Sequence, residues 1–98
     1  MYALAIVRYR RTLEEAEGTR GAHREYLLQL KRQGLLLASG PFDPHVGGAL
    51  LLRVPDGDTG ETLNRIRDED PFTKQNLAQY ELLVWNVKTG IEDLDGIR

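Results

Sequence analysis

The sequence predicts a small α+β domain in which two helices cover one face of a four-stranded antiparallel sheet. Four short segments rich in apolar and β-branched residues alternate with two segments of helical periodicity, in the order β-α-β-β-α-β. The connection between the second and third strand segments is too short to cross over the sheet, so these two strands must run antiparallel. This order of elements is that of the split β-α-β unit of ferredoxin-like folds.

The strands are expected where apolar runs are too short to be helices, at residues 2–9, 35–39, 49–54 and 80–87. The helices are expected where apolar residues recur every three or four positions, at residues 20–34 and 58–70. Residues 72–79 should form a connection with one helical turn. Residues 89–98 are polar and contain glycine, which is typical of a loosely attached tail.

Short-range signals mark the ends of the helices. Thr12, followed three residues later by Glu15, has the spacing of a capping box and predicts a single turn before the first long helix. Gly34 can close that helix in a left-handed conformation. Asp58 is expected to cap the second long helix, and Pro71 disfavours helical backbone at the residue before it.

The composition restricts the classes of protein to which the chain can belong. Its 98 residues leave room for one core, which we assign to residues 1–88. The net charge of −2 gives no reason to expect nucleic-acid binding, and the strands lack the aromatic-rich pattern of RNA-binding sheets. No stretch approaches the roughly 20 apolar residues that cross a bilayer, so no membrane partner is expected.

The absence of cysteine excludes disulfides, thiolate catalysis and sulfur ligands for metals. The beginning of the sequence lacks the pattern of a signal peptide, and we therefore expect a cytoplasmic protein. The two histidines have no recognisable metal-ligand spacing, so neither a metal nor another cofactor is expected. Helices on one face of the sheet leave the other face bare, and a second copy of so small a chain is the simplest cover. A homodimer is expected.

His23 is the first candidate for a functional residue. Helical spacing places it on the same face as Tyr26, Leu27 and Leu30, where a core residue is expected. It is either a packed structural histidine with one satisfied hydrogen bond or an acid–base group that faces a pocket.

Asp70 shows the same anomaly on the face of the second helix that carries Leu63 and Ile66. A buried carboxylate needs a partner, and His23 is the natural one because the two helices of this fold lie on the same side of the sheet. The carboxylate would fix the imidazole tautomer and orient the ring as a general base. The alternative is an ordinary solvated aspartate at the end of a helix.

Two further segments contain residues that could belong to a site. Ser39, Gly40 and Pro41 either end a strand or form the wall of a pocket, because glycine permits close approach and proline lacks an N–H. His45 lies in the turn between the second and third strands, where an exposed loop histidine is favoured over a ligand. Tyr80 and Trp85 of the last strand are expected to pack in the core or an interface.

Several of these residues occur together in a pattern that resembles the YCII-related (YciI-like) family. The pattern consists of R-x-x-H at 20–23, Y-L at 26–27, glycine at 34, S-G-P at 39–41 and D-P-F at 70–72. The resemblance covers about residues 2–87. Each motif is weak alone, but their order and spacing together are fairly specific.

The resemblance implies a ferredoxin-like domain that pairs into a dimeric α+β barrel-like assembly. It also implies an active site built from His23 and Asp70, in which Arg20 either binds a substrate carboxylate or pairs with Asp70. One branch of the family removes HCl from a chlorinated aromatic diol, which indicates proton-transfer chemistry in general. We assign substrate binding to Arg20 and to four motif residues: Ser39, Gly40, Pro41 and Phe72.

The sequence thus predicts a cofactor-free enzyme of the isomerase or lyase type that acts on a small polar or aromatic molecule. His23 would be the base, Asp70 its orienting partner and Arg20 the group that binds an anion. The alternative is a non-catalytic dimeric module for ligand binding or interaction, in which His23 and Asp70 form a structural pair.

Overall fold

The computed structural model describes residues 1–97. Its helices and strands, in chain order, are β1 (Tyr2–Tyr9), α1 (Leu13–Glu17), α2 (Arg20–Arg32), β2 (Leu36–Pro41), β3 (Gly47–Arg53), α3 (Thr59–Glu69), α4 (Pro71–Lys74), β4 (Ala78–Trp85) and α5 (Ile91–Asp95).

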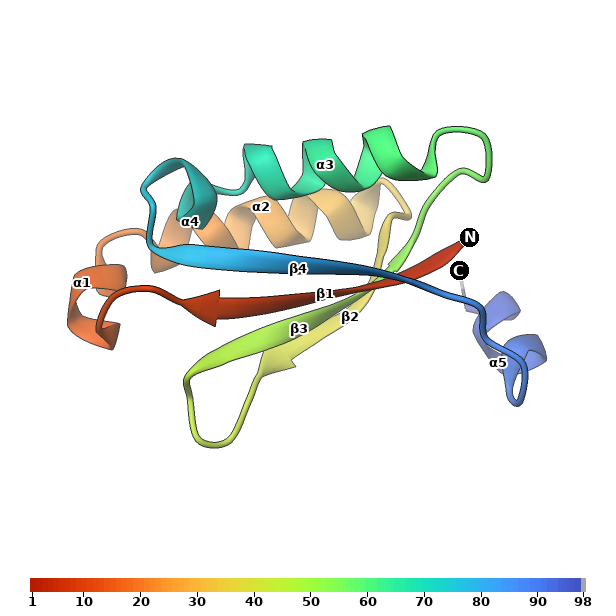
Figure 1. The fold of residues 1–98 in the computed structure, drawn as a ribbon, viewed down its shortest axis with the longest axis horizontal. Coiled ribbons are helices and arrows are strands. Elements are labelled where there is room, and N and C mark those ends of the chain that lie inside the picture. The colour runs from red at the N-terminus through yellow and green to blue at the C-terminus, as the bar shows by residue number, and fades with distance from the viewer. Residues whose placement is uncertain (98) are drawn as a thin grey trace.

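The four strands form one sheet in the order β2-β3-β1-β4, and every neighbouring pair is antiparallel. The two long helices, α2 and α3, lie over the same face of this sheet (Figure 1). This arrangement confirms the predicted ferredoxin-like fold with its four-stranded antiparallel sheet.

The central strand β1 explains how the core is built. Its residues alternate between the two faces of the sheet, and Ala3, Ala5 and Val7 point toward the helices and are buried. These small side chains leave room for the apolar stripes of α2 and α3, which bury Leu30 and Ile66 respectively. The core therefore lies between one face of the sheet and the two helices.

Most of the predicted helix ends are observed. Thr12 and Glu15 form the capping box of α1, with the Glu15 N–H 3.2 Å from the Thr12 hydroxyl and the Thr12 N–H 2.9 Å from the Glu15 carboxylate. Gly34 has a φ of 79°, the left-handed conformation expected after a helix. One expectation is wrong, because the Asp58 side chain makes no capping hydrogen bond to α3.

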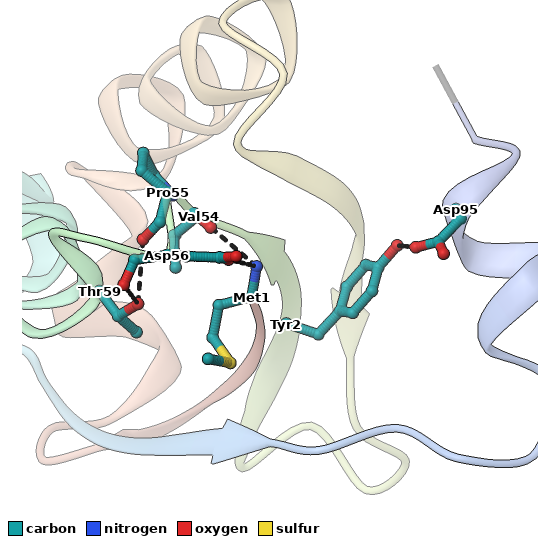
Figure 2. A network of polar contacts seen from close by, with 7 residues as sticks. All are labelled: Met1, Tyr2, Val54, Pro55, Asp56, Thr59 and Asp95. Carbon is teal, nitrogen blue, oxygen red and sulfur yellow. Dashed lines mark hydrogen bonds and ion pairs between the residues drawn. The ribbon is translucent and has the colours of Figure 1, made fainter.

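The start of α3 is instead tied to the chain before it. The Thr59 hydroxyl donates to the carbonyls of Pro55 at 2.9 Å and Asp56 at 3.1 Å, as Figure 2 shows. The N-terminal amine of Met1 joins this network through the Val54 carbonyl at 3.0 Å and the Asp56 carboxylate at 2.7 Å. These contacts hold the start of β1 beside the loop that leads into α3.

The C-terminal segment contains a short helix, α5, that the sequence patterns do not predict. The Tyr2 hydroxyl donates to Asp95 at 2.6 Å (Figure 2), and Arg53 donates to the backbone carbonyls of Leu94 and Ile97. Helix α5 lies near the two chain ends, away from α2 and α3 (Figure 1). None of the helices within residues 1–97 is long and apolar enough to cross a membrane.

Candidate active site

His23 and Asp70, the two polar side chains on otherwise apolar helix faces, meet between the helices. Nδ1 of His23, in the first turn of α2, lies 2.8 Å from Oδ1 of Asp70. Asp70 ends α3 with an extended backbone (φ −66°, ψ 127°), the conformation that Pro71 requires of the residue before it. Proline then begins the short helix α4, and the Asp70 carboxylate accepts the N–H of Phe72 at 2.9 Å as its cap.

Asp70 is completely buried, and its carboxylate accepts hydrogen bonds from three groups. Oδ1 accepts from His23 and from the Phe72 N–H, while Oδ2 accepts from the Tyr80 hydroxyl. These bonds offset the cost of removing a carboxylate from water. Because a carboxylate only accepts, Nδ1 of a neutral His23 carries the proton and Nε2 is left as the basic atom.

Phe72 fixes the plane of the His23 ring. The two rings stack with their centroids 4.0 Å apart and their planes 6° from parallel, and Phe72 is only 2% exposed. His23 keeps 17% of its side chain exposed, and within residues 1–97 its Nε2 makes no hydrogen bond. The ring is therefore held at Nδ1 and on one face, while Nε2 is free to contact another molecule.

His23 lines a cavity of about 360 Å³ between α2 and the β2–β3 hairpin. Its floor is largely apolar and includes Val7, Leu36 and Leu50, whereas one side carries the cationic side chains Arg20, Arg24 and Lys31. No carboxylate of residues 1–97 lines it. Such a cavity suits one small molecule with an apolar body and a negatively charged group.

The structure brings six of the seven predicted site residues to this cavity: Arg20, His23, Ser39, Gly40, Pro41 and Phe72. Asp70 is not part of the wall but lies behind His23. Arg20 pairs with Glu17 at 2.9 Å rather than with Asp70, and 44% of its side chain is exposed. It is therefore available to a ligand from the cavity side.

His45 does not occupy the exposed loop position that the sequence suggests. It is half-buried, lines the cavity, and has its Nε2 2.8 Å from the Tyr9 hydroxyl. The expectation fails because the hairpin extends two residues further than predicted on each strand, which brings the turn onto the end of β1. The Gly47-Gly48 pair, which begins two residues after His45, is the signal that could have indicated this close approach.

Two tyrosines at the site keep their protons more firmly than free tyrosine. Burial raises the pKa of Tyr80, and the Asp70 carboxylate beside it raises that pKa further. Burial also raises the pKa of Tyr9, although nearby Arg20 acts in the opposite direction. The role of Tyr80 as a donor to Asp70 was not predicted, because its spacing in β4 indicates only packing.

Metal ligands do not gather at this cavity. Within residues 1–97 no group of three or more His, Asp or Glu side chains is placed to hold a metal ion. The groups around the cavity include the imidazole of His23 together with hydroxyl and cationic side chains.

The profile of the YCII-related domain family matches residues 1–86. The chain belongs to the YCII-related family. Among solved structures, this YCII-related chain is similar to 5-chloro-2-hydroxyhydroquinone dehydrochlorinase (TftG) from Burkholderia phenoliruptrix in complex with 2,5-dihydroxybenzoquinone. The TM-score is 0.73 at 23% identity, with 90% of this chain and 96% of the other covered. No curated protein sequence matches the chain.

Proposed function

We propose that this YCII-related chain is a cofactor-free enzyme in which His23 removes a proton from a small substrate. The observation that carries the proposal is the His23–Asp70 hydrogen bond, which leaves Nε2 of His23 free at the cavity wall. A buried carboxylate that orients an imidazole in this way is the usual arrangement of a positioned general base. Proton abstraction leads to isomerisation or, where the substrate has a leaving group, to elimination.

The substrate is proposed to be a small hydroxylated ring compound that binds as an anion. The cavity volume of about 360 Å³ fits one such ring, and its apolar floor can contact the ring faces. Arg20 can bind the anionic oxygen at the rim. The structurally similar dehydrochlorinase, whose complex contains 2,5-dihydroxybenzoquinone, makes this class the first to examine.

The test is an assay of HCl release from 5-chloro-2-hydroxyhydroquinone, together with the binding of 2,5-dihydroxybenzoquinone. His23→Gln should lower kcat by roughly 10²–10⁴-fold, because it removes the base while leaving the cavity shape similar. Arg20→Gln should mainly raise KM, because it removes an interaction present before and during the reaction. Arg32→Gln is the matched control, since Arg32 pairs with Glu25 on the exposed side of α2 and should leave both constants unchanged.

Two results would contradict the proposal. One is turnover that survives His23→Gln, which would remove the base from the mechanism. The other is tight binding of the quinone without turnover of the diol or of related hydroxylated rings, which would leave the chain as a ligand-binding module with a structural His23–Asp70 pair.

A further inference from the structure

A second polar pair faces the same cavity. The Tyr9 hydroxyl and Nε2 of His45 are 2.8 Å apart, and both residues line the wall together with His23. We propose that Tyr9, positioned by His45, is a second catalytic group, which donates to the substrate oxygen that becomes negative when His23 removes a proton. This inference rests on the proposed function and names its substrate class: carbonyl or phenolic compounds in which charge moves onto an oxygen.

The aromatic contacts hold Tyr9 in a defined position relative to His23. The Tyr9 ring meets Phe72 edge-on, with centroids 5.9 Å apart and an interplanar angle of 85°, and Phe72 stacks on His23 at 4.0 Å. On its other side Tyr9 meets the His45 ring at 5.3 Å. Phe72 therefore lies between Tyr9 and His23, and all three residues line one cavity. A substrate in that cavity can contact both acid–base groups.

The backbone places His45 on Tyr9. The N–H of Tyr9 donates to the Val46 carbonyl at 3.1 Å, so the end of β1 is bonded to the hairpin turn. The Phe42 N–H donates to the Gly47 carbonyl at 2.9 Å and closes that turn. Main-chain hydrogen bonds therefore fix the turn that carries His45, as is required of a residue that positions another side chain.

The proposed step moves one proton to His23 and leaves negative charge on the substrate oxygen. His23 Nε2 takes a proton from a substrate carbon, and the electron pair of that C–H bond forms a C=C bond as the carbonyl electrons move to oxygen. Tyr9 keeps its proton and donates a hydrogen bond to that oxygen, while the Nε2–H of His45 donates to the Tyr9 hydroxyl and fixes its direction. His23 then returns its proton to another carbon of the substrate or, where a leaving group departs with the electron pair, gives the proton to solvent.

The surroundings of Tyr9 favour a neutral hydroxyl that donates a hydrogen bond. Burial raises the pKa of Tyr9, so its hydroxyl stays protonated at neutral pH and donates a hydrogen bond to the developing oxyanion. A hydrogen bond from a preorganised hydroxyl stabilises an oxyanion more strongly in a cavity that partly excludes water than in bulk water. Arg20, on the same cavity wall, adds positive charge for that oxyanion.

The experiment uses 4-nitrophenol, whose absorbance distinguishes the bound phenolate from the phenol, as a mimic of the oxyanion. The wild-type chain should bind the phenolate, and Tyr9→Phe should weaken binding by about 10- to 100-fold, the usual range for a hydrogen bond to a charged group. Tyr2→Phe is the matched control on the same strand. Its hydroxyl bonds Asp95, and Tyr2 does not line the cavity, so its removal should leave phenolate affinity unchanged.

Variants of His45 test its positioning role. His45→Ala should weaken phenolate binding and His45→Gln should restore most of it, because the glutamine amide can still donate to Tyr9. A merely structural role would show equal loss of affinity in both variants, in proportion to their loss of thermal stability. That result would overturn the assignment of His45.

The outcomes separate this inference from the proposed function. If Tyr9→Phe binds the phenolate like wild type while His23→Gln loses turnover, the inference fails and the His23 proposal stands. If Tyr9→Phe loses phenolate affinity and His23→Gln still turns over its substrate, Tyr9 remains the group that binds the oxyanion and the His23 proposal fails. A wild-type chain that does not bind the phenolate overturns the inference outright.

Discussion

The buried carboxylate of Asp70 is both a site residue and a part of the core. It accepts three hydrogen bonds from three different elements: His23 in α2, Phe72 in α4 and Tyr80 in β4. Any substitution at Asp70 therefore changes stability as well as the orientation of His23. Effects on activity at this position need a separate measurement of folding, whereas His23 can be substituted with fewer consequences because it has a partly exposed ring.

Asp70→Asn should lower the free energy of unfolding by about 1–3 kcal/mol, because an amide cannot accept from all three donors and leaves a buried group unsatisfied. Urea unfolding followed by Trp85 fluorescence measures this change. Asp68→Asn is the matched control, since Asp68 is exposed on α3 and pairs only with Arg67. Equal stability of the two variants would contradict the structural role of Asp70.

The raised pKa of Tyr80 predicts that the stability of the fold depends on pH. Burial and Asp70 raise its pKa in the folded state above the value of about 10 in the unfolded chain. The unfolded chain therefore loses this proton first as pH rises, and the contribution of Tyr80 is complete below about pH 10 and declines above it. Compared with Tyr80→Phe, wild type should be more stable at pH 8, and the difference should shrink by up to about 1.4 kcal/mol per unit above pH 10. Urea unfolding measures this difference, and a constant difference in the free energy of unfolding between the two proteins from pH 8 to 11 would refute the prediction.

At the scale of elements, the β2–β3 hairpin determines the shape of the cavity. Pro41 pairs with Gly48 at its end, and both strands continue two residues beyond their predicted limits. Gly47 lies so close to β1 that a Cβ there would be 1.9 Å from the Val7 carbonyl oxygen. The missing side chain at this position allows the hairpin turn, with His45, to meet Tyr9.

Gly47→Ala should lower the free energy of unfolding by about 1–3 kcal/mol, because the methyl group would strain the pairing of β1 and β3. It should also weaken binding of 4-nitrophenolate, since His45 would move away from Tyr9. Gly60→Ala in α3 is the control: no atom lies within 4 Å of its Cβ, and stability should stay unchanged or rise slightly. Urea unfolding and phenolate absorbance measure both effects, and wild-type behaviour of Gly47→Ala would contradict the tight contact.

The strands and helices also show which features of the fold and the site can be predicted from the sequence. The order of strands and helices was predictable because each long element has a clear periodicity, and His23 and Asp70 stood out as polar residues on apolar faces. The extent of the hairpin was not predictable, because proline and glycine at 41, 47 and 48 are usually strand terminators. In an edge strand and at a close backbone contact they are tolerated, which only the three-dimensional pairing reveals.

At the scale of the whole molecule, no long helix of residues 1–97 covers the second face of the sheet, which α5 contacts only at its end, through Tyr2 and Arg53. The registers of β1 with β3 and β4 place Leu4, Leu51 and Leu83 in one row across this face, and Leu83 is 43% exposed. Two residues before Leu83 on the edge strand β4, Glu81 forms a 2.8 Å ion pair with Arg8, so the apolar row has a polar border on this side. A central apolar region with a polar rim is typical of a protein interface.

We propose that this face pairs with the same face of a second copy, the assembly that the family resemblance implies. Leu83→Glu should prevent pairing, because it would place a charge in the apolar row of both copies and leave it unpaired on burial. Sedimentation equilibrium should then show a dimer for wild type and a monomer for Leu83→Glu. Leu13→Glu, on the equally exposed Leu13 of α1, is the control and should remain dimeric. A wild-type chain that sediments as a monomer at all concentrations would refute the pairing and leave this face open to another partner.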